Sequence, residues 1–220
     1  MTDHQNTLYR NQTVENPTHT KTRLARLYEY TQLSYQQALD LQMQLVEQRL
    51  SGDNAEDAVI LLEHPHTYTL GRAANTNNIL LSDEYCRQLG IEIHQTDRGG
   101  DVTYHGPGQL IIYPIISLQS HSLSVGAYVR ALEEVAIRTL SDFSITARHG
   151  DDARGVWVGP KKIAALGVRV RRWITMHGLA LNVNTDLSHF RGINPCGVPG
   201  AEVTSMVEEG FDVRRQDEVR

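Results

Sequence analysis

The amino-acid sequence predicts an α+β fold, in which helices flank a mixed and largely antiparallel sheet. Apolar residues recur at helical spacing in two long segments, 34–50 and 124–140. From Gly155 the spacing changes to period two, which is typical of an antiparallel meander. Helices and strands do not alternate as they do in parallel βα folds, so a doubly wound nucleotide-binding sheet is disfavoured.

Length and charge restrict the classes of protein to consider. The chain has 220 residues, of which 40% are hydrophobic, enough to bury one core. Its 21 basic and 26 acidic residues give a net charge of −5, which disfavours binding to nucleic-acid phosphates. No apolar stretch has the length of a membrane span, so we expect no membrane contact. Only two cysteines occur and they form no disulfide framework, which favours a cytoplasmic location.

The polar segment 1–21 is expected to be a disordered tail, followed by a single domain over 22–220. Within that domain the apolar spacing predicts a helix over 34–50 and a buried strand over 58–63. We expect an irregular segment over 64–72, because it contains Pro65, which cannot donate to a ladder.

His64 and His66 have the spacing of a pair of metal ligands. No third ligand lies near them in the sequence, so we expect no metal site and no other cofactor. We expect each side chain either to lie on the surface or to form hydrogen bonds.

Further along the chain, a short helix over 82–89 is predicted to contain Cys86 as a packed and inert thiol. A β-branched apolar run predicts a buried strand over 110–116. The most regular apolar face lies on the helix over 124–140. Near the end of the chain we expect a short helix over 202–209.

A polar stretch rich in glycine runs from Arg98 to Gln109 between apolar segments, with the sequence RGGDVTYHGPGQ. It lacks the lysine and hydroxyl residue of a phosphate loop and the glycine spacing of a dinucleotide fingerprint. Two interpretations remain open. The stretch forms the wall of a binding site, where glycine lets a ligand approach the backbone, or it is a hairpin connection without a chemical role.

Cys196 lies between proline and glycine in a predicted turn over 194–197, where the backbone holds the thiol in a fixed place. A thiolate needs a nearby cation or base, and the candidates are His105, His177 and the adjacent pair Lys161 and Lys162. The alternative for Cys196 is a buried structural thiol. The alternative for Lys162 is a solvated residue at the end of a strand.

Four motifs together resemble the octanoyltransferases of lipoate biosynthesis, the octanoyl-[acyl carrier protein]:protein N-octanoyltransferases also known as the lipoate-protein ligase B family. In chain order they are RGGDVTYHGPGQ at 98–109, KKIAALGVR at 161–169, HGLALN at 177–182 and NPCG at 194–197. The resemblance covers most of the chain from about residue 58 to 205. It implies the α+β fold shared by lipoate and biotin protein ligases, and a catalytic role for the domain over 22–220.

The same resemblance implies the reaction and its residues. Cys196 takes the octanoyl group from octanoyl-acyl carrier protein as a thioester, and Lys162, the lysine directly before the Ile-Ala pair, is its partner. The acceptors are the lipoyl domains of 2-oxoacid dehydrogenase complexes and the glycine cleavage H protein. The residues expected to bind the substrate are Arg98, Gly99, Gly100, Asp101, Val102, Thr103, Tyr104, His105, Ala165, Leu166, Gly167, Gly178, Leu179 and Ala180.

Two other functions remain as alternatives. One is an ATP-dependent lipoate or octanoate protein ligase of the same fold, which needs no nucleophilic cysteine. The other is an acyl-binding module without catalytic activity, in which Cys196 is inert.

A group of arginines stands out on an acidic protein. Strand alternation places Arg169 and Arg171 on one face, with Arg172 at the following turn. This group attracts an acidic protein partner, forms a solvated strand face, or forms ion pairs with the chain's own carboxylates.

Overall fold

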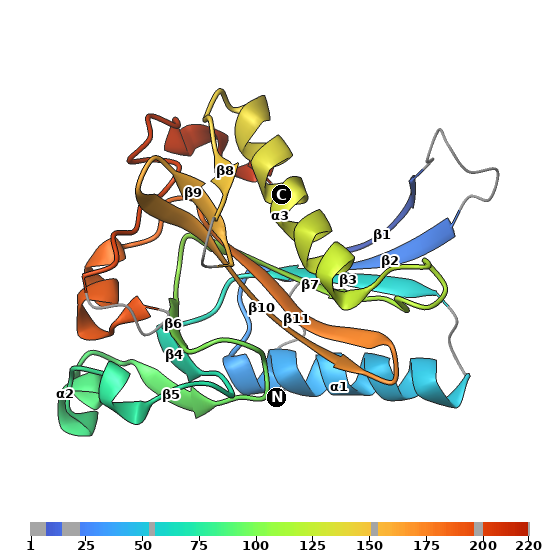
Figure 1. The fold of residues 1–220 in the computed structure, drawn as a ribbon, viewed down its shortest axis with the longest axis horizontal. Helices are drawn as coiled ribbons and strands as arrows, with labels where there is room; N and C mark the ends of the chain where they lie inside the picture. Colours follow the sequence, from blue (N-terminus) through green and yellow to red (C-terminus); the bar gives the residue numbers. More distant parts are fainter. Residues whose placement is uncertain (1–7, 15–22, 53–55, 151–153, 196–199, 220) are drawn as a thin grey trace.

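An eight-stranded sheet runs through the molecule and carries helices on both faces (Figure 1). The computed structural model describes residues 8–14, 23–52, 56–150, 154–195 and 200–219. The strand order is β1-β2-β3-β7-β11-β10-β9-β8. These strands are β1 (Leu8–Val14), β2 (Arg23–Glu29), β3 (Asp57–Leu62), β7 (Gln109–Ile115), β8 (Arg148–His149), β9 (Val156–Val158), β10 (Lys161–Arg171) and β11 (Ile174–Asn182). Only β2 and β3 pair in parallel, so the sheet is mixed and largely antiparallel, as predicted.

A second, three-stranded sheet lies beside the large one, with the order β5-β4-β6. It consists of β4 (Thr67–Leu70), β5 (Glu92–Gln95) and β6 (Val102–His105). Strand β4 pairs in parallel with β5 and antiparallel with β6. The helices are α1 (Tyr35–Ser51), α2 (Asp83–Gln88) and α3 (Val125–Asp142), with 3₁₀ turns η1 (Thr76–Asn78), η2 (Leu187–Gly192) and η4 (Val213–Val219).

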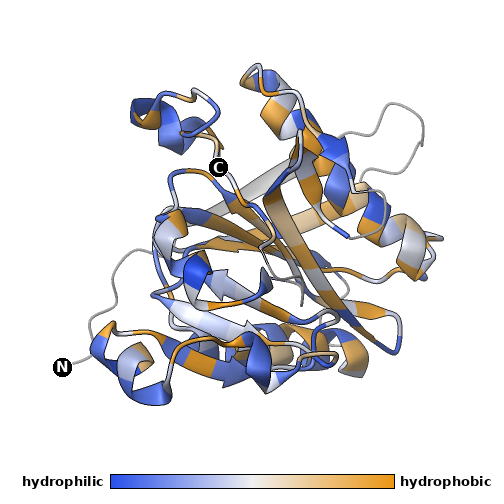
Figure 2. Ribbon diagram, turned by 60° about the vertical axis from the view of Figure 1, so that its left-hand side comes forward, coloured by the Kyte–Doolittle hydropathy of each residue, from blue (hydrophilic) through white to orange (hydrophobic). Residues whose placement is uncertain are grey.

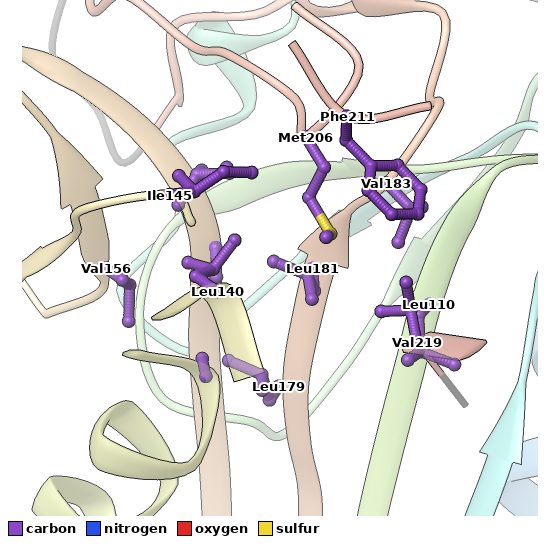
Figure 3. Packing of buried hydrophobic residues seen from close by; sticks show 13 residues of the cluster. Leu110, Leu140, Ile145, Val156, Leu179, Leu181, Val183, Met206, Phe211 and Val219 are labelled. Atoms are coloured by element: carbon purple, nitrogen blue, oxygen red, sulfur yellow. The ribbon is translucent and has the colours of Figure 1, made fainter. Parts of the chain in front are cut away.

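The alternation of side chains along β7 builds the two cores of the large sheet. Leu110 belongs to the cluster that includes residues of α3, whereas Ile111 and Tyr113 belong to the cluster on the α1 side. Successive side chains of a strand point to opposite faces, so one apolar strand covers both layers. Figure 2 shows hydrophobic residues gathered along these central strands, with hydrophilic residues on the outer helical faces. Figure 3 shows the α3-side cluster, where Met206 from the end of the chain lies over Leu181 and Phe211 lies beside Val183.

The two long helices begin at serine caps, as their sequences suggest. Ser34 Oγ accepts from the amide of Gln37, and the Gln37 side chain accepts from the amide of Ser34, which forms a capping box. Ser124 Oγ accepts a hydrogen bond from the amide of Ala127 at the start of α3. The predicted helices over 34–50, 82–89 and 124–140 are thus confirmed within one or two residues at each end.

Two predicted segments differ from the structure. Residues 64–72 were expected to be irregular, but β4 occupies 67–70, because Pro65 lies before the strand and does not interrupt its ladder. Residues 202–209 were expected to form a helix, but Val203 forms a bridge with Lys162. That bridge holds the backbone extended, and only a turn follows over 206–210.

Strand β1 lies within the segment for which the sequence predicts a disordered tail, and residues 1–7 and 15–22 lie outside the described residues. The division into a tail and one catalytic domain stays a prediction. In the part of the chain that the structure describes, none of the helices combines the length and apolarity required to cross a membrane.

Candidate active site

An apolar cavity opens where β6 and the glycine-rich segment before it face the middle of β10 and β11. Its lining combines backbone of the glycine motifs with aliphatic, aromatic and polar side chains. The lining residues are Tyr35, Arg98, Gly100, Asp101, Val102, Thr103, His105, Tyr113, Ala165, Leu166, Gly167, His177, Gly178, Leu179 and Ala180. The cavity is narrow and mainly apolar, which suits an unbranched hydrocarbon chain.

Twelve of the fourteen residues predicted to bind substrate line this cavity, since only Gly99 and Tyr104 are absent from its walls. Gly99 donates its amide to the carbonyl of Val168 over 2.9 Å, which ties the glycine segment to β10. Tyr104 points to the other face of β6, where its hydroxyl bonds to His66 Nδ1 over 2.7 Å and its ring packs against Phe190. Both residues therefore support the wall of the cavity without lining it.

The buried guanidinium of Arg98 supports the wall of the cavity. It donates to the carbonyls of Thr69 and Asp101, each over 2.7 Å, and to the carbonyl of Gly99 over 3.0 Å. The Asp101 carboxylate in turn accepts from the Val102 amide over 2.7 Å. Arg98 thereby fixes the glycine-rich segment against β4 and also lines the cavity, and its role in substrate binding stays a prediction.

Three lining residues were not predicted as substrate-binding, namely Tyr35, Tyr113 and His177. His177 is buried, and its Nε2 donates to Asp97 over 2.9 Å. Burial, together with the guanidinium groups of Arg98 and Arg169, lowers the pKa of His177 to about 3. The imidazole is therefore neutral near pH 7 and serves as a hydrogen-bonding wall of the cavity.

A chain of buried hydrogen bonds runs beneath the cavity. His105 Nδ1 and Gln109 Oε1 are 2.8 Å apart, and Gln109 Nε2 donates to Asn182 Oδ1 over 2.9 Å. Asn182 Nδ2 then donates to the carbonyl of Thr204 over 2.9 Å. Burial, followed by the charge of nearby His64, lowers the pKa of His105 well below its ordinary value. His105 is therefore a neutral member of a structural network.

Lys162 lies at the start of β10 with only 7% of its surface exposed. Its Nζ donates to the carbonyl of Arg154 over 3.1 Å and lies 5.0 Å from the centroid of the Trp157 ring. Glu202 and Thr204 form backbone hydrogen bonds to the amide and carbonyl of Lys162, each over 2.9 Å. The lysine is thus clamped between β9 and the segment 202–204.

A second, small cavity contains Lys162 and adjoins the apolar cavity. Thr103 and Ala165 line both. Pro195 and Phe190 also line the small cavity. Its volume of about 10 Å³ leaves room for roughly one water-sized group.

Cys196 follows Pro195 directly and lies outside the described residues, as does the rest of the predicted turn through Gly197. The backbone before it is fixed, because the amide of Asn194 donates to the carbonyl of Asn78 over 2.8 Å. The other cysteine, Cys86, is buried in α2, as predicted. Burial raises the pKa of its thiol, which disfavours the thiolate.

The two histidines considered as metal ligands have hydrogen-bonding roles. His64 bonds to the carbonyl of Leu33 over 2.8 Å and to the hydroxyl of Tyr113 over 2.9 Å. His66 bonds to Tyr104 as described above.

The arginines predicted as a docking patch form ion pairs within the chain. Arg169 pairs with Asp97, and Arg171 pairs with Glu47 of α1. Arg171 is nine residues from Lys162 along β10, a distance of about 30 Å at strand rise. These contacts favour the interpretation in which the arginines are bound by the chain's own carboxylates.

Comparison with known proteins gives a consistent result. The family model "Lipoyl protein ligase A/B catalytic domain" matches residues 34–219. The octanoyltransferase of Solibacter usitatus is 52% identical over 81% of this chain and 80% of its own length. That of Syntrophobacter fumaroxidans is 47% identical over 84% of this chain and 80% of its own. A bipartite lipoate protein ligase from Thermoplasma acidophilum is 17% identical, with a TM-score of 0.66 over 89% of this chain and 80% of its own.

The fold and the cavity therefore define a catalytic domain of the lipoyl protein ligase A/B type. Within that class, the sequence identity of 47–52% to octanoyltransferases assigns the chain to one family. The chain belongs to the octanoyltransferase family and is an acyltransferase.

Proposed function

We propose that this protein transfers an octanoyl group from octanoyl-acyl carrier protein to a lysine of lipoyl domains, through a thioester on Cys196. The acceptors are lipoyl domains of 2-oxoacid dehydrogenase complexes and the glycine cleavage H protein, and the reaction takes place in the cytoplasm. The names of the relatives, octanoyltransferases 41–52% identical to this chain, support the choice of acyl group.

The observation that carries the proposal is the shared cavity of Lys162 and Pro195. Pro195 is bonded to Cys196, so the thiol is attached within one residue of the cavity that holds the lysine. The same small cavity continues into the narrow apolar one through Thr103 and Ala165. An acyl chain lying in the apolar cavity would place its carbonyl carbon beside Lys162.

In the first half-reaction, Lys162 accepts the proton of the Cys196 thiol. The sulfur attacks the thioester carbonyl of the donor, and the bond from that carbonyl to the carrier's sulfur breaks as the bond to Sγ forms. The Lys162 ammonium returns its proton to the departing carrier thiolate. The products are octanoyl-Cys196 and the free carrier thiol.

In the second half-reaction, the neutral amine of the lipoyl-domain lysine attacks the carbonyl of octanoyl-Cys196. An amide bond forms, the bond to Sγ breaks, and Lys162 accepts the proton from the attacking nitrogen. That proton then restores the Cys196 thiol. The intermediate divides one transfer between two large substrates into two transfers at one fixed sulfur.

Intact mass spectrometry tests the assignment of the nucleophile. Octanoyl-acyl carrier protein alone is expected to add one octanoyl mass to the wild type and to Cys86→Ala, and none to Cys196→Ala. If Cys196→Ala transfers octanoate at the wild-type rate, the covalent mechanism is wrong.

An assay for ATP dependence separates the proposed reaction from that of a ligase. With octanoyl-acyl carrier protein, lipoyl-domain modification is expected to proceed without ATP. Modification from free octanoate that requires ATP would identify a ligase instead.

A further inference from the structure

A large open groove lies outside the small cavity that holds Lys162. It has a volume of about 570 Å³, within the range of about 300–1,000 Å³ typical of ligand sites. One wall is the 3₁₀ turn η2 with the residue before it, Asp186. The opposite side is formed by the segment around Ala201 and Val203.

The groove is continuous with the reaction site. Phe190, Pro195 and Val203 line both the groove and the small cavity of Lys162. Thr103 and Ala165 then join the small cavity to the apolar one. One path therefore leads from the apolar cavity, past Lys162, into the groove.

Backbone hydrogen bonds hold the wall of the groove in place. Leu80 donates its amide to the carbonyl of Gly192 over 2.8 Å, and Ile79 forms a β-bridge with Ile193. The carboxylate of Asp186 accepts from the amide of Ser188 over 2.9 Å and so caps η2. These contacts fix η2 and its flanking residues, which form one wall of the groove.

The charged side chains of the groove differ in whether they form hydrogen bonds within the protein. Asp186 is bound as the cap of η2. Glu208 is exposed, and the hydroxyl of Thr204 donates to Glu209 over 2.7 Å and not to Glu208. Arg191 is exposed, and across the described residues its guanidinium makes no ion pair or hydrogen bond. Arg191 is thus the cation of the groove that is available to an anionic ligand.

The chemistry of a carrier-bound thioester matches this arrangement. When the acyl chain lies in the apolar cavity and its carbonyl lies at Lys162, the rest of the donor extends from the sulfur toward the groove. In an acyl carrier protein that part is a phosphopantetheine arm, a chain with two amides that ends in a phosphate. The side chains of Ser188 and Asn194 offer a hydroxyl and an amide for the arm, and Arg191 offers a guanidinium for the phosphate.

We propose that this groove binds the phosphopantetheine arm of the acyl donor and that Arg191 pairs with its phosphate. The inference rests on the proposed function, because it takes the donor to be a carrier-bound thioester. An acceptor lysine has only four methylene groups and no phosphate, so it does not need a groove of this length or its guanidinium.

The test compares binding of two unreactive donor analogues in which a methylene group replaces the thioester sulfur. One is the octanoyl-phosphopantetheine analogue, and the other is the octanoyl-pantetheine analogue, which lacks the phosphate. Arg191→Gln is expected to weaken binding of the first about tenfold, equivalent to about 1.4 kcal/mol, and to leave the second unchanged. Arg191→Lys keeps the charge and is expected to lose less than Arg191→Gln.

Arg172→Gln is the matched control, since Arg172 is also exposed but lies at the turn after β10, far from Lys162. It is expected to change neither dissociation constant. Equal loss for both analogues in Arg191→Gln would mean that Arg191 supports η2 and does not bind phosphate. No loss for either, or a weaker affinity for the lipoyl domain alone, would overturn the assignment of the groove to the donor arm.

The binding measurement is independent of the reaction. If octanoyl-acyl carrier protein leaves wild-type Cys196 unmodified, the proposed function fails. The affinity difference between the two analogues would still report on the groove.

Discussion

Replacing Gly155 by alanine tests directly whether the position of Lys162 sets the rate. Gly155 packs on this lysine, and a Cβ added there would lie 2.8 Å from the carbonyl oxygen of Ala164 and 3.0 Å from Lys162 Cε. To reach an ordinary contact of 3.4 Å, the separation from the Ala164 oxygen has to grow by 0.6 Å (3.4 − 2.8), and that from Lys162 Cε by 0.4 Å (3.4 − 3.0). The lysine side chain can move by 0.4 Å, whereas the contact with the Ala164 carbonyl is relieved only by a backbone movement of residue 155 or of β10.

Displacements of this size are expected to reduce catalysis substantially. A misplacement of about 1 Å can cost about 100-fold in rate, and a shift of half that size is expected to cost about 10-fold. The expected effect falls on kcat for acylation of Cys196 and on its alkylation by iodoacetamide near neutral pH. Binding of the unreactive donor analogues is expected to be unaffected, because Gly155 does not line the apolar cavity or the groove.

Gly159→Ala provides the matched control. Gly159 also has a positive φ, +54° against +139° for Gly155, but a Cβ placed on it meets no atom within 4 Å. Both substitutions are expected to lower the free energy of unfolding by about 1–3 kcal/mol through backbone strain. Equal rates of acylation in the two variants would refute the claim that the side-chain position of Lys162 determines the rate.

Three further predictions concern groups around the site. Glu133 Oε1 accepts a hydrogen bond from the amide of Gly155 over 3.2 Å, so Glu133→Ala is expected to lower kcat about tenfold with KM unchanged. Glu133→Gln keeps an acceptor and is expected to recover most of the rate. Equal loss in both variants would point to a general loss of structure. Burial lowers the pKa of His64 to about 4 and that of His177 to about 3, so the unfolded chain binds protons that the folded chain does not. Urea titrations are expected to show the free energy of unfolding falling as pH drops from about 6.5 to 4, with His64→Gln removing about 1.4 kcal/mol per pH unit from the slope; an unchanged slope would contradict this assignment. Arg169→Gln is expected to slow acylation by a small octanoyl thioester and by octanoyl-acyl carrier protein alike, and loss confined to the carrier substrate would restore the docking hypothesis.

The sequence predicted the elements whose apolar pattern is long and regular. The helices over 34–50 and 124–140 and the strand over 110–116 lie where expected, because one periodic face of each is buried in a cluster. The short helix predicted over 202–209 was wrong because a local pattern does not register a tertiary bridge, here the one between Val203 and Lys162.

The candidate site was predictable where it is contiguous in sequence and not where it is assembled in space. The glycine-rich segment and the middle of β10 and β11 line the cavity as the motifs suggest. Tyr35 reaches it from α1, a helix that the sequence indicated only as core, and Tyr113 comes from a strand that it indicated only as buried. The ion pair between Arg169 and Asp97 was equally hidden, because the partners are 72 residues apart.

The most direct test of the account is a single-turnover transfer from isolated octanoyl-Cys196 enzyme to a lipoyl domain, without donor and without ATP. The account predicts that the octanoyl mass leaves the enzyme and appears on the lipoyl-domain lysine at least as fast as steady-state turnover, and that Lys162→Ala slows this step by about 10²–10⁴-fold. An acyl-enzyme that transfers its octanoyl group more slowly than the enzyme turns over would contradict the account, because the thioester would then lie off the reaction path.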